Sequence, residues 1–395
     1  MTKETRGFAT RAIHGSSEPI DGPVASPIVA ASTYRFHSVE DLAKANDGRA
    51  RADSFYSRYG NANFTNVEER VALLEGAEGA LLFASGMAAI SAVAFAFLKP
   101  GARLLAQHEI YGGTVAFFRE VLAAWGVEVV FFDANDTARL EAECARGAAL
   151  VYVETPTNPL CRIVDLRRVA DAARKSGAPV VCDATFASPV NQATLSFGVD
   201  LVIQSATKYL GGHDDLLGGT IAGSRELLRR IVPIRKRLGG VPDPQQAWRL
   251  ERSLKTVALR VARQNESALE IARWLGTRQE VEQVHYPGLP EHPDHGLARK
   301  QMKGFGGMLA FDLRGGEPAA RRFAEALRLV ALAPSLGSVQ TLICPPIHTS
   351  HSSLSSEERR KLGILDGSLR LSVGIEEPAD LIADLELGFE ALARG

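Results

Sequence analysis

The chain has 395 residues, of which 46% are hydrophobic and 23% charged, a composition typical of a globular protein rather than a disordered one. Its 45 Lys and Arg residues nearly balance 46 Asp and Glu residues, so a net charge of -1 gives no general attraction to nucleic acid or an anionic membrane. At roughly 150 residues per domain, this length predicts two to three domains.

The first segment of the chain, 1–60, is rich in Gly, Pro, Ser and Arg and has little apolar periodicity. We expect an extended N-terminal arm that packs on a partner subunit. Its opening, MTKETRGFATRAIHG, lacks the apolar core of a secretory signal, so export is not indicated.

The cysteines are scattered along the chain without a paired short spacing. They are Cys144, Cys161, Cys182 and Cys344. This spacing fits neither a zinc ribbon nor a disulfide framework, and it predicts reduced residues in a cytoplasmic protein.

An uncharged run at 79–98, GALLFASGMAAISAVAFAFL, has about the ~20 residues that span a bilayer. It is rich in Gly, Ala and Ser and has no polybasic flank. We therefore expect a buried strand, a turn and a buried helix here rather than a membrane span.

A series of short apolar runs alternates with helical patterns such as 67–76 and 165–177. The runs lie at 80–83, 103–106, 127–132, 149–153, 179–182 and 201–203. Nearly continuous apolar strands between helices are typical of a parallel sheet covered on both faces. We expect an α/β domain at 61–255.

Beyond about residue 224 the pattern changes to longer amphipathic helices, the last of them at 378–394. Shorter strand candidates lie at 308–311 and 369–373. This pattern predicts a smaller α+β domain at 256–395.

Two histidine pairs, His292 with His295 and His348 with His351, have spacings that could suggest a metal. No acidic or Cys partner has a ligand-like spacing near either pair. We expect solvated or capping histidines and no metal site.

Polar residues follow several of the apolar runs, at the edge where a parallel α/β sheet gathers its ligands. The groups are Ser85-Gly86-Met87, Glu154 to Pro159, Asp183-Ala184-Thr185 and Gln204 to Lys208. The chain has no GxGxxG after the first strand and no GxxxxGK[ST], which argues against a dinucleotide or nucleoside triphosphate site.

This set matches the needs of pyridoxal phosphate. The amine of Lys208 could form a Schiff base with the aldehyde, and Asp183 could keep the pyridine nitrogen protonated. The backbone N–H groups of Gly86 and Met87 would bind the phosphate. Each residue alone has an ordinary alternative: a surface cation for Lys208 and a capping carboxylate for Asp183. The alternatives do not explain why all these groups follow successive strands.

The sequence resembles the pyridoxal-phosphate-dependent trans-sulfuration enzymes of cysteine and methionine metabolism. The resemblance runs from Phe8-Ala9-Thr10-Arg11 to the C-terminus. Its motifs are YSRYGNAN (56–63), LEGAEGALLFASGMAAI (74–90), YGGT (111–114), ETPTNP (154–159), SATKYLGGHDDLLGG (205–219), RSLKT (252–256) and LRLSVGIE (369–376). It implies the aspartate-aminotransferase type of fold, with a central mostly parallel sheet, a smaller C-terminal α+β domain, and a homotetramer of active dimers.

The resemblance also implies a role for each matching residue. Lys208 forms the Schiff base and acts as general base, Asp183 pairs with the pyridine nitrogen, and Tyr111 stacks on the ring and can exchange protons with the substrate. Asn158 contacts the ring hydroxyl and Thr185 lies beside the pyridine. The residues implied at the phosphate are Gly86, Met87, Ser205 and Thr207, with Tyr56 and Arg58 from the neighbouring subunit. Arg370, helped by Ser335, binds the substrate α-carboxylate.

Departures from the family pattern bear on the substrate. Cystathionine-handling members tend to carry Asn-Arg after YGGT and Glu before Ser-Leu-Gly, where this chain has Val115-Ala116 and Pro334. The Val-Ala pair resembles methionine γ-lyase, although that enzyme usually has Cys at the position of Gly113. Proline before Ser-Leu-Gly is reminiscent of plant-type γ-synthases. Asn61-Ala62-Asn63 replaces the common Asn-Pro-Thr, and we expect no effect on the cofactor.

The residues at these substrate-reading positions favour an enzyme that cleaves the carbon-sulfur bond of methionine or homocysteine by γ-elimination. The alternatives are a cystathionine γ-synthase or γ-lyase, a cofactor-binding protein without turnover, and a biosynthetic enzyme using the same γ-chemistry on an unusual amino acid.

Overall fold

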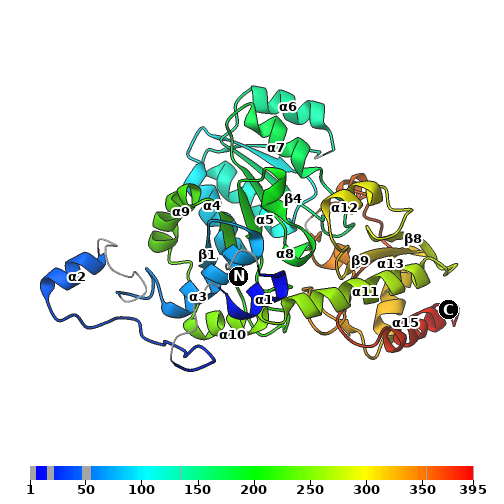
Figure 1. Ribbon diagram of the computed structural model, residues 1–395. Helices are drawn as coiled ribbons and strands as arrows, with labels where there is room; N and C mark the ends of the chain where they lie inside the picture. Colours follow the sequence, from blue (N-terminus) through cyan, green and yellow to red (C-terminus); the bar gives the residue numbers. More distant parts are fainter. Residues whose placement is uncertain (1–5, 16–21, 47–54, 134, 353, 395) are drawn as a thin grey trace.

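The computed structural model describes residues 6–15, 22–46, 55–133, 135–352 and 354–394. Helices α1 (Phe8–His14) and α2 (Val39–Asn46) precede a large layered α/β unit, and a second, smaller sheet with its own helices lies toward the C-terminus (Figure 1). Helix α2 lies well away from the main body, at the left of Figure 1.

The larger sheet has seven strands in the order β1-β7-β6-β5-β4-β2-β3. They are β1 (Gly79–Phe83), β2 (Arg103–Gln107), β3 (Glu128–Phe132), β4 (Leu150–Glu154), β5 (Val180–Asp183), β6 (Leu201–Gln204) and β7 (Gly219–Gly223). Strand β7 runs antiparallel to both its neighbours, and every other pair is parallel. Each of the six predicted apolar runs forms a strand, which confirms the mostly parallel sheet.

Helices cover both faces of this sheet (Figure 1). They are α3 (Ala62–Glu75), α4 (Gly86–Phe97), α5 (Gly112–Ala116), α6 (Thr137–Ala145), α7 (Leu166–Arg174), α8 (Ser188–Asn191), α9 (Arg225–Leu238) and α10 (Pro244–Leu254). The longer α11 (Val257–Leu275) follows them and packs against the smaller sheet. Helix α5 continues into the π-helical segment η3 (Phe117–Leu122), and the 3-10 turn η4 (Thr194–Phe197) precedes β6.

Strand β1 shows why both faces need cover. Its Leu81 and Phe83 pack into a core formed with α4 and α9, whereas Ala80 and Leu82 face the core formed with α3 and α10. Alternate side chains of a strand point to opposite faces, so a continuous apolar run is buried only between two helical layers.

The smaller sheet has the order β10-β11-β12-β9-β8. Its strands are β8 (Val281–His285), β9 (Met308–Leu313), β10 (Ala331–Leu332), β11 (Leu342–Cys344) and β12 (Ser368–Ser372). The accompanying helices are α12 (His295–Gln301), α13 (Gly316–Ala326), the 3-10 turn η5 (Pro346–His348), α14 (Ser356–Lys361) and α15 (Pro378–Ala393). The predicted mixed α+β architecture is confirmed.

The uncharged run 79–98 divides as expected into β1, a turn and α4. The side chain of Ser85 caps α4 by accepting the backbone N–H of Ala88 at 3.1 Å. Within the described residues, no helix has both the length and the hydropathy required to cross a bilayer.

Strand β7 is the element of the larger sheet that the sequence did not reveal. Its sequence, GTIAG, has low strand propensity. The glycines are nevertheless required: a Cβ on Gly219 would lie 2.2 Å from the carbonyl oxygen of Ser85, and one on Gly223 would lie 2.5 Å from that of Asp200. Close approach of backbone, rather than side-chain packing, therefore selects these residues.

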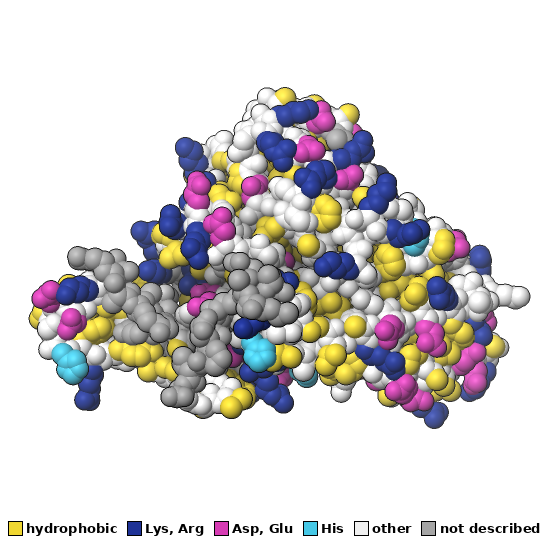
Figure 2. All heavy atoms as spheres, viewed as in Figure 1, with side chains coloured by type: hydrophobic (Ala, Val, Ile, Leu, Met, Phe, Trp, Pro, Cys, Tyr) yellow, Lys and Arg dark blue, Asp and Glu magenta, His cyan; other side chains and the backbone are white. Residues whose placement is uncertain are grey.

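Acidic and basic side chains are interspersed over the face of the molecule that Figure 2 shows. This distribution agrees with the near balance of charges in the sequence.

The carboxyl group of Glu75, at the end of α3, is buried beneath the larger sheet. One oxygen accepts a hydrogen bond from the amide of Gln204 at 2.9 Å, and the other has no partner among the described residues. Burial raises the pKa of Glu75 from 4.5 to about 7.

We predict that Glu75→Gln stabilises the protein at pH 8. Between pH 4.5 and about 7 the unfolded chain loses this proton while the folded chain retains it, so stability falls as pH rises. The total loss is up to about 3 kcal/mol at ~1.4 kcal/mol per pKa unit, and the neutral Gln escapes it. Urea unfolding at pH 4.5 and pH 8 should show a gain mainly at pH 8. The exposed Glu270→Gln should show none, and an equal gain at both pH values for Glu75→Gln would contradict this account.

Candidate active site

A cavity of about 740 Å³ opens at the carboxyl ends of the central strands of the larger sheet. It is lined by eleven of the residues predicted for the site: Gly86, Met87, Tyr111, Asn158, Asp183, Thr185, Ser205, Thr207, Lys208, Ser335 and Arg370. The last two come from the smaller sheet unit, so the cavity lies between the two sheets.

One end of the cavity is formed by the N-terminus of α4. The first N–H groups of a helix have no partner within it, and those of Gly86 and Met87 border the cavity. A Cβ on Gly86 would lie 3.0 Å from the Cβ of Ser205 and 3.1 Å from its hydroxyl oxygen. Only glycine leaves this concave cradle open, and its donors and hydroxyls suit an anion such as a phosphate.

Two buried carboxyl groups lie at the base of the cavity, on neighbouring strands. Asp183 ends β5 and accepts hydrogen bonds from the backbone N–H of Thr185 at 3.0 Å and from its hydroxyl at 2.5 Å. Glu154 ends β4 in register with Asp183 and accepts the backbone N–H of Tyr111 at 2.8 Å. Burial raises the pKa of both groups, and for Glu154 the neighbouring Asp183 raises it further.

Thr185 also links Asp183 to the end of the neighbouring strand β6. Its hydroxyl oxygen accepts the backbone N–H of Ser205 at 2.8 Å while its proton goes to Asp183. The side chain of Tyr152 donates a longer bond of 3.4 Å to the other carboxyl oxygen of Asp183. The acid is thus held in one orientation.

Lys208 lies opposite, with its amine directed at the smaller domain. The amine donates to the hydroxyl of Ser335 at 2.9 Å. Burial and, secondarily, the positive charge of Arg370 lower the pKa of Lys208 to about 8, so a fraction of the amine is neutral near physiological pH.

Arg370 lies on β12 and is oriented by two acceptors. Its guanidinium donates to the side-chain oxygen of Asn158 at 3.1 Å and to the backbone carbonyl of Ser335 at 2.9 Å. Ser335 has a φ of 88°, which a non-glycine residue adopts only under strain. In that conformation its hydroxyl accepts a hydrogen bond from Lys208 and its carbonyl accepts one from Arg370.

Tyr111 precedes α5 at the mouth of the cavity and is partly exposed. A Cβ on Gly113 would lie 2.5 Å from its ring. The position where methionine γ-lyase usually has Cys is therefore filled by the phenol in this conformation.

Tyr56 and Arg58 are the predicted site residues that do not line the cavity of their own chain. Both precede α3, and the Arg58 guanidinium lies 5.4 Å from the centre of the Tyr56 ring and 5.3 Å from that of Tyr59.

The histidines follow the prediction only in part. His348 is exposed, and His292 accepts the backbone N–H of Asp294 at 3.2 Å. His351, however, is buried rather than solvated, and burial lowers the pKa of both His292 and His351 to about 4. No group of three or more His, Cys, Asp or Glu side chains among the described residues is placed to hold a metal.

Several lining residues were not assigned to the site from sequence: Ser85, Ile90, Glu154, Phe186, Leu217, Leu336, His348, Thr349 and Ser350. Glu154 and Ser85 could have been identified from the sequence, since they lie at the ends of predicted strands. His348, Thr349 and Ser350 had none, because their loop reaches the cavity only through the packing of the smaller domain.

Comparison with known proteins agrees with this geometry. The family described as Cys/Met metabolism PLP-dependent enzyme matches residues 9–390. The chain is 41% identical to an L-methionine gamma-lyase of Pseudomonas putida over 98% of both chains. It is 37% identical to an O-succinylhomoserine sulfhydrylase of Pseudomonas aeruginosa, over 98% of this chain and 96% of that one.

A solved structure of cystathionine gamma synthase from Xanthomonas oryzae pv. oryzae, in complex with aminoacrylate and cysteine, superimposes with a TM-score of 0.93. It is 39% identical and covers 98% of this chain and 99% of that one.

The fold and the cavity are those of a fold type I enzyme that uses pyridoxal phosphate. The chain belongs to the Cys/Met metabolism PLP-dependent enzyme family, the trans-sulfuration enzymes. The residues present suit the cofactor: the cradle at Gly86 accommodates an anion, buried Asp183 has no cationic partner among the described residues, and Lys208 has a partly neutral amine.

Proposed function

We propose that the protein is a carbon-sulfur γ-lyase that converts methionine or homocysteine to 2-oxobutyrate, ammonia and a thiol. The observation that carries this proposal is the distribution of charge in the cavity. Apart from His348, the ionisable side chains among its described lining residues are Glu154, Asp183, Lys208 and Arg370. Each already has a hydrogen-bond partner in the site: Tyr111 for Glu154, Thr185 for Asp183, Ser335 for Lys208 and Asn158 for Arg370. None is left for the distal amino acid group of cystathionine.

The L-methionine gamma-lyases among the relatives support the same substrate class. Besides the Pseudomonas putida enzyme, that of Porphyromonas gingivalis is 39% identical over 98% of both chains. Apolar lining residues such as Ile90, Leu217 and Pro334 suit an uncharged thioether.

For the cofactor, we propose that Lys208 binds the aldehyde carbon and that Asp183 holds the ring nitrogen. Gly86, Met87, Ser205 and Thr207 would bind the phosphate, and Asn158 the ring hydroxyl, with Thr185 beside the pyridine. When bound, pyridoxal phosphate supplies an electron sink that stabilises negative charge at the substrate α-carbon. Asp183 favours this role because a carboxylate beside the ring nitrogen keeps that nitrogen cationic.

Substrate orientation falls to Arg370 and Ser335 in this proposal. The guanidinium offers a planar pair of donors that matches the α-carboxylate, and Asn158 with the Ser335 carbonyl holds the guanidinium in place. The α-amine would then lie beside Lys208, which hydrogen-bonds Ser335.

Proton transfer is assigned to Lys208 and Tyr111. A general base works best when its pKa lies near the working pH, and the Lys208 pKa of about 8 meets that condition. The free amine of Lys208 would remove the α-proton and then carry protons along the substrate side chain. Tyr111, at the mouth of the cavity, stacks on the ring and protonates the departing sulfur.

We further propose a homotetramer of active dimers in the cytoplasm. The N-terminal arm exposes apolar side chains at Val24, Ile28, Val39 and Leu42, a surface that a second copy would cover. Arg58 and Tyr56 would then reach the cofactor phosphate of the neighbouring subunit. All four cysteines are free thiols, as in a reducing compartment.

The alternative is a cystathionine γ-synthase or γ-lyase, which the Xanthomonas oryzae pv. oryzae structure favours at similar identity. It requires the distal amino acid group to be bound by residues other than those lining this cavity.

We predict that the purified holoenzyme releases 2-oxobutyrate from methionine or homocysteine, because the described lining leaves no charged side chain free for a distal amino acid group. A ketoacid assay with mass spectrometry of the products would measure it. The result that would contradict the proposal is that neither substrate releases 2-oxobutyrate while cystathionine forms from an activated homoserine and cysteine. The protein would then be a cystathionine γ-synthase.

We also predict that Arg58→Ala and Lys208→Ala, each inactive alone, complement each other when coexpressed. If Arg58 serves the neighbouring site, a mixed dimer has one doubly defective site and one intact site. Dual-tag purified mixed assemblies should then recover up to about half the wild-type turnover, since each mixed dimer has one intact site of its two equivalent sites.

Two differently tagged Lys208→Ala subunits provide the matched control and should remain inactive. They should also lack the cofactor absorbance that depends on the lysine. Mixed dimers that stay inactive would place Arg58 at the site of its own chain.

A further inference from the structure

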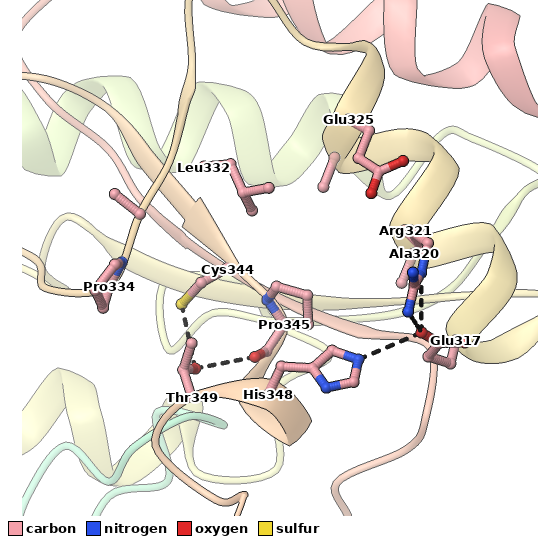
Figure 3. A pocket seen from close by; sticks show the side chains of 12 residues that line it. Glu317, Ala320, Arg321, Glu325, Leu332, Pro334, Cys344, Pro345, His348 and Thr349 are labelled. Carbon is pink, nitrogen blue, oxygen red and sulfur yellow. Dashed lines mark hydrogen bonds and ion pairs between the residues drawn. The ribbon is translucent and has the colours of Figure 1, made fainter.

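A second cavity, of about 260 Å³, lies in the smaller domain between α13 and the strands β10 and β11 (Figure 3). Its lining is mainly apolar: Ala320, Ala324, Leu332, Ala333, Cys344 and Pro345. We call it the outer cavity. The side chain of Leu332 is also half exposed to solvent, so this residue tolerates change better than a core leucine.

The outer cavity adjoins the active-site cavity. Pro334, His348 and Thr349 line both of them. The hydroxyl of Thr349 is fixed on the outer side by the carbonyl of Pro345 at 2.9 Å and the thiol of Cys344 at 3.6 Å (Figure 3). The two cavities thus share one wall.

The shared wall lies next to the proposed position of the substrate. Ser335 contacts the amine of Lys208 and, through its carbonyl, Arg370, so it lies next to the α-amine and α-carboxylate positions of the proposed function. Pro334 is the adjacent residue. A substrate side chain that extended from the α-carbon past Pro334 would reach the wall that the two cavities share.

The charges of the outer cavity are largely neutralised. Glu317 accepts hydrogen bonds from Arg321 at 2.8 Å and from His348 at 3.3 Å (Figure 3). Glu325 adds a negative charge near Arg321. The described lining of the outer cavity therefore offers no unpaired cation to an anionic group. Its excess carboxylate also disfavours the binding of an anionic group.

We infer that the outer cavity binds the γ-substituent of the substrate and selects uncharged alkyl thioethers longer than methionine. This inference rests on the proposed γ-lyase function and specifies its substrate class. Each CH₂ group transferred from water to an apolar lining stabilises binding enough to change an equilibrium constant about fourfold.

The test compares S-butyl-homocysteine with methionine, because both release 2-oxobutyrate. In Leu332→Asp, a carboxylate enters the apolar lining, and the ratio of kcat/KM for S-butyl-homocysteine to that for methionine should fall about tenfold. Leu329→Asp is the matched control, since Leu329 is similarly exposed and lines neither cavity. It should leave the ratio unchanged.

A binding measurement separates this inference from the proposed function. Methyl butyl sulfide has no amino acid group and cannot react with the cofactor, so calorimetric titration of the holoenzyme reports apolar binding without turnover, and the comparison with Leu332→Asp assigns that binding to the outer cavity. We expect binding in the wild type and in Leu329→Asp and about tenfold weaker binding in Leu332→Asp.

Failure to release 2-oxobutyrate from homocysteine, methionine or any other thioether would overturn the proposed function, while the sulfide titration would still test whether the outer cavity binds an alkyl thioether. The inference is overturned if the sulfide does not bind, or binds the wild type and Leu332→Asp equally. An unchanged kcat/KM ratio in Leu332→Asp, or preferred turnover of cystathionine over S-butyl-homocysteine, would also overturn it.

Discussion

At the carboxyl end of β5, the carboxyl group of Asp183 is buried at the base of a cavity and held by the backbone and hydroxyl of Thr185. A buried carboxylate is costly without a positive partner. The same sheet edge carries Glu154, which makes a second ionised acid more costly still. A bound cation next to Asp183 relieves this cost, and the protonated ring of pyridoxal phosphate is such a cation. In the proposed function, the rest of the site is arranged around that pairing.

The fold explains how the other groups reach the same point. Parallel strands bring their carboxyl ends to one edge of the sheet, so residues following β1, β4, β5 and β6 converge although they are far apart in sequence. The smaller domain closes the other side, with Arg370 on β12 and Ser335 in a strained conformation. Ser335 joins the halves, since its hydroxyl accepts from Lys208 and its carbonyl from Arg370. Burial then lowers the pKa of Lys208 toward the pH at which a lysine can transfer protons.

Sequence predicted the parts of the structure that repeat a simple pattern. The apolar runs became strands because a strand buried on both faces must be continuously apolar, and residues that follow four of them line one cavity. Strand β7 was not predicted because its glycines are required by the close backbone of Ser85 and Asp200 rather than by side-chain packing. The loop of His348 to Ser350 and the outer cavity beside it escaped because their positions depend on how the two sheets pack together. The domain boundaries at 60 and 255, like the placing of Arg58 in a neighbouring site, stay predictions.

The most direct test of the central pairing is the protonation state of the cofactor's ring nitrogen. Holoenzyme loaded with pyridoxal phosphate labelled with ¹⁵N in the ring can be measured by NMR at neutral pH, alongside Asp183→Asn. The account predicts a protonated nitrogen in the wild type and an unprotonated one in the variant, because only a carboxylate stabilises the ring cation in this buried site. An unprotonated nitrogen in the wild type would contradict it.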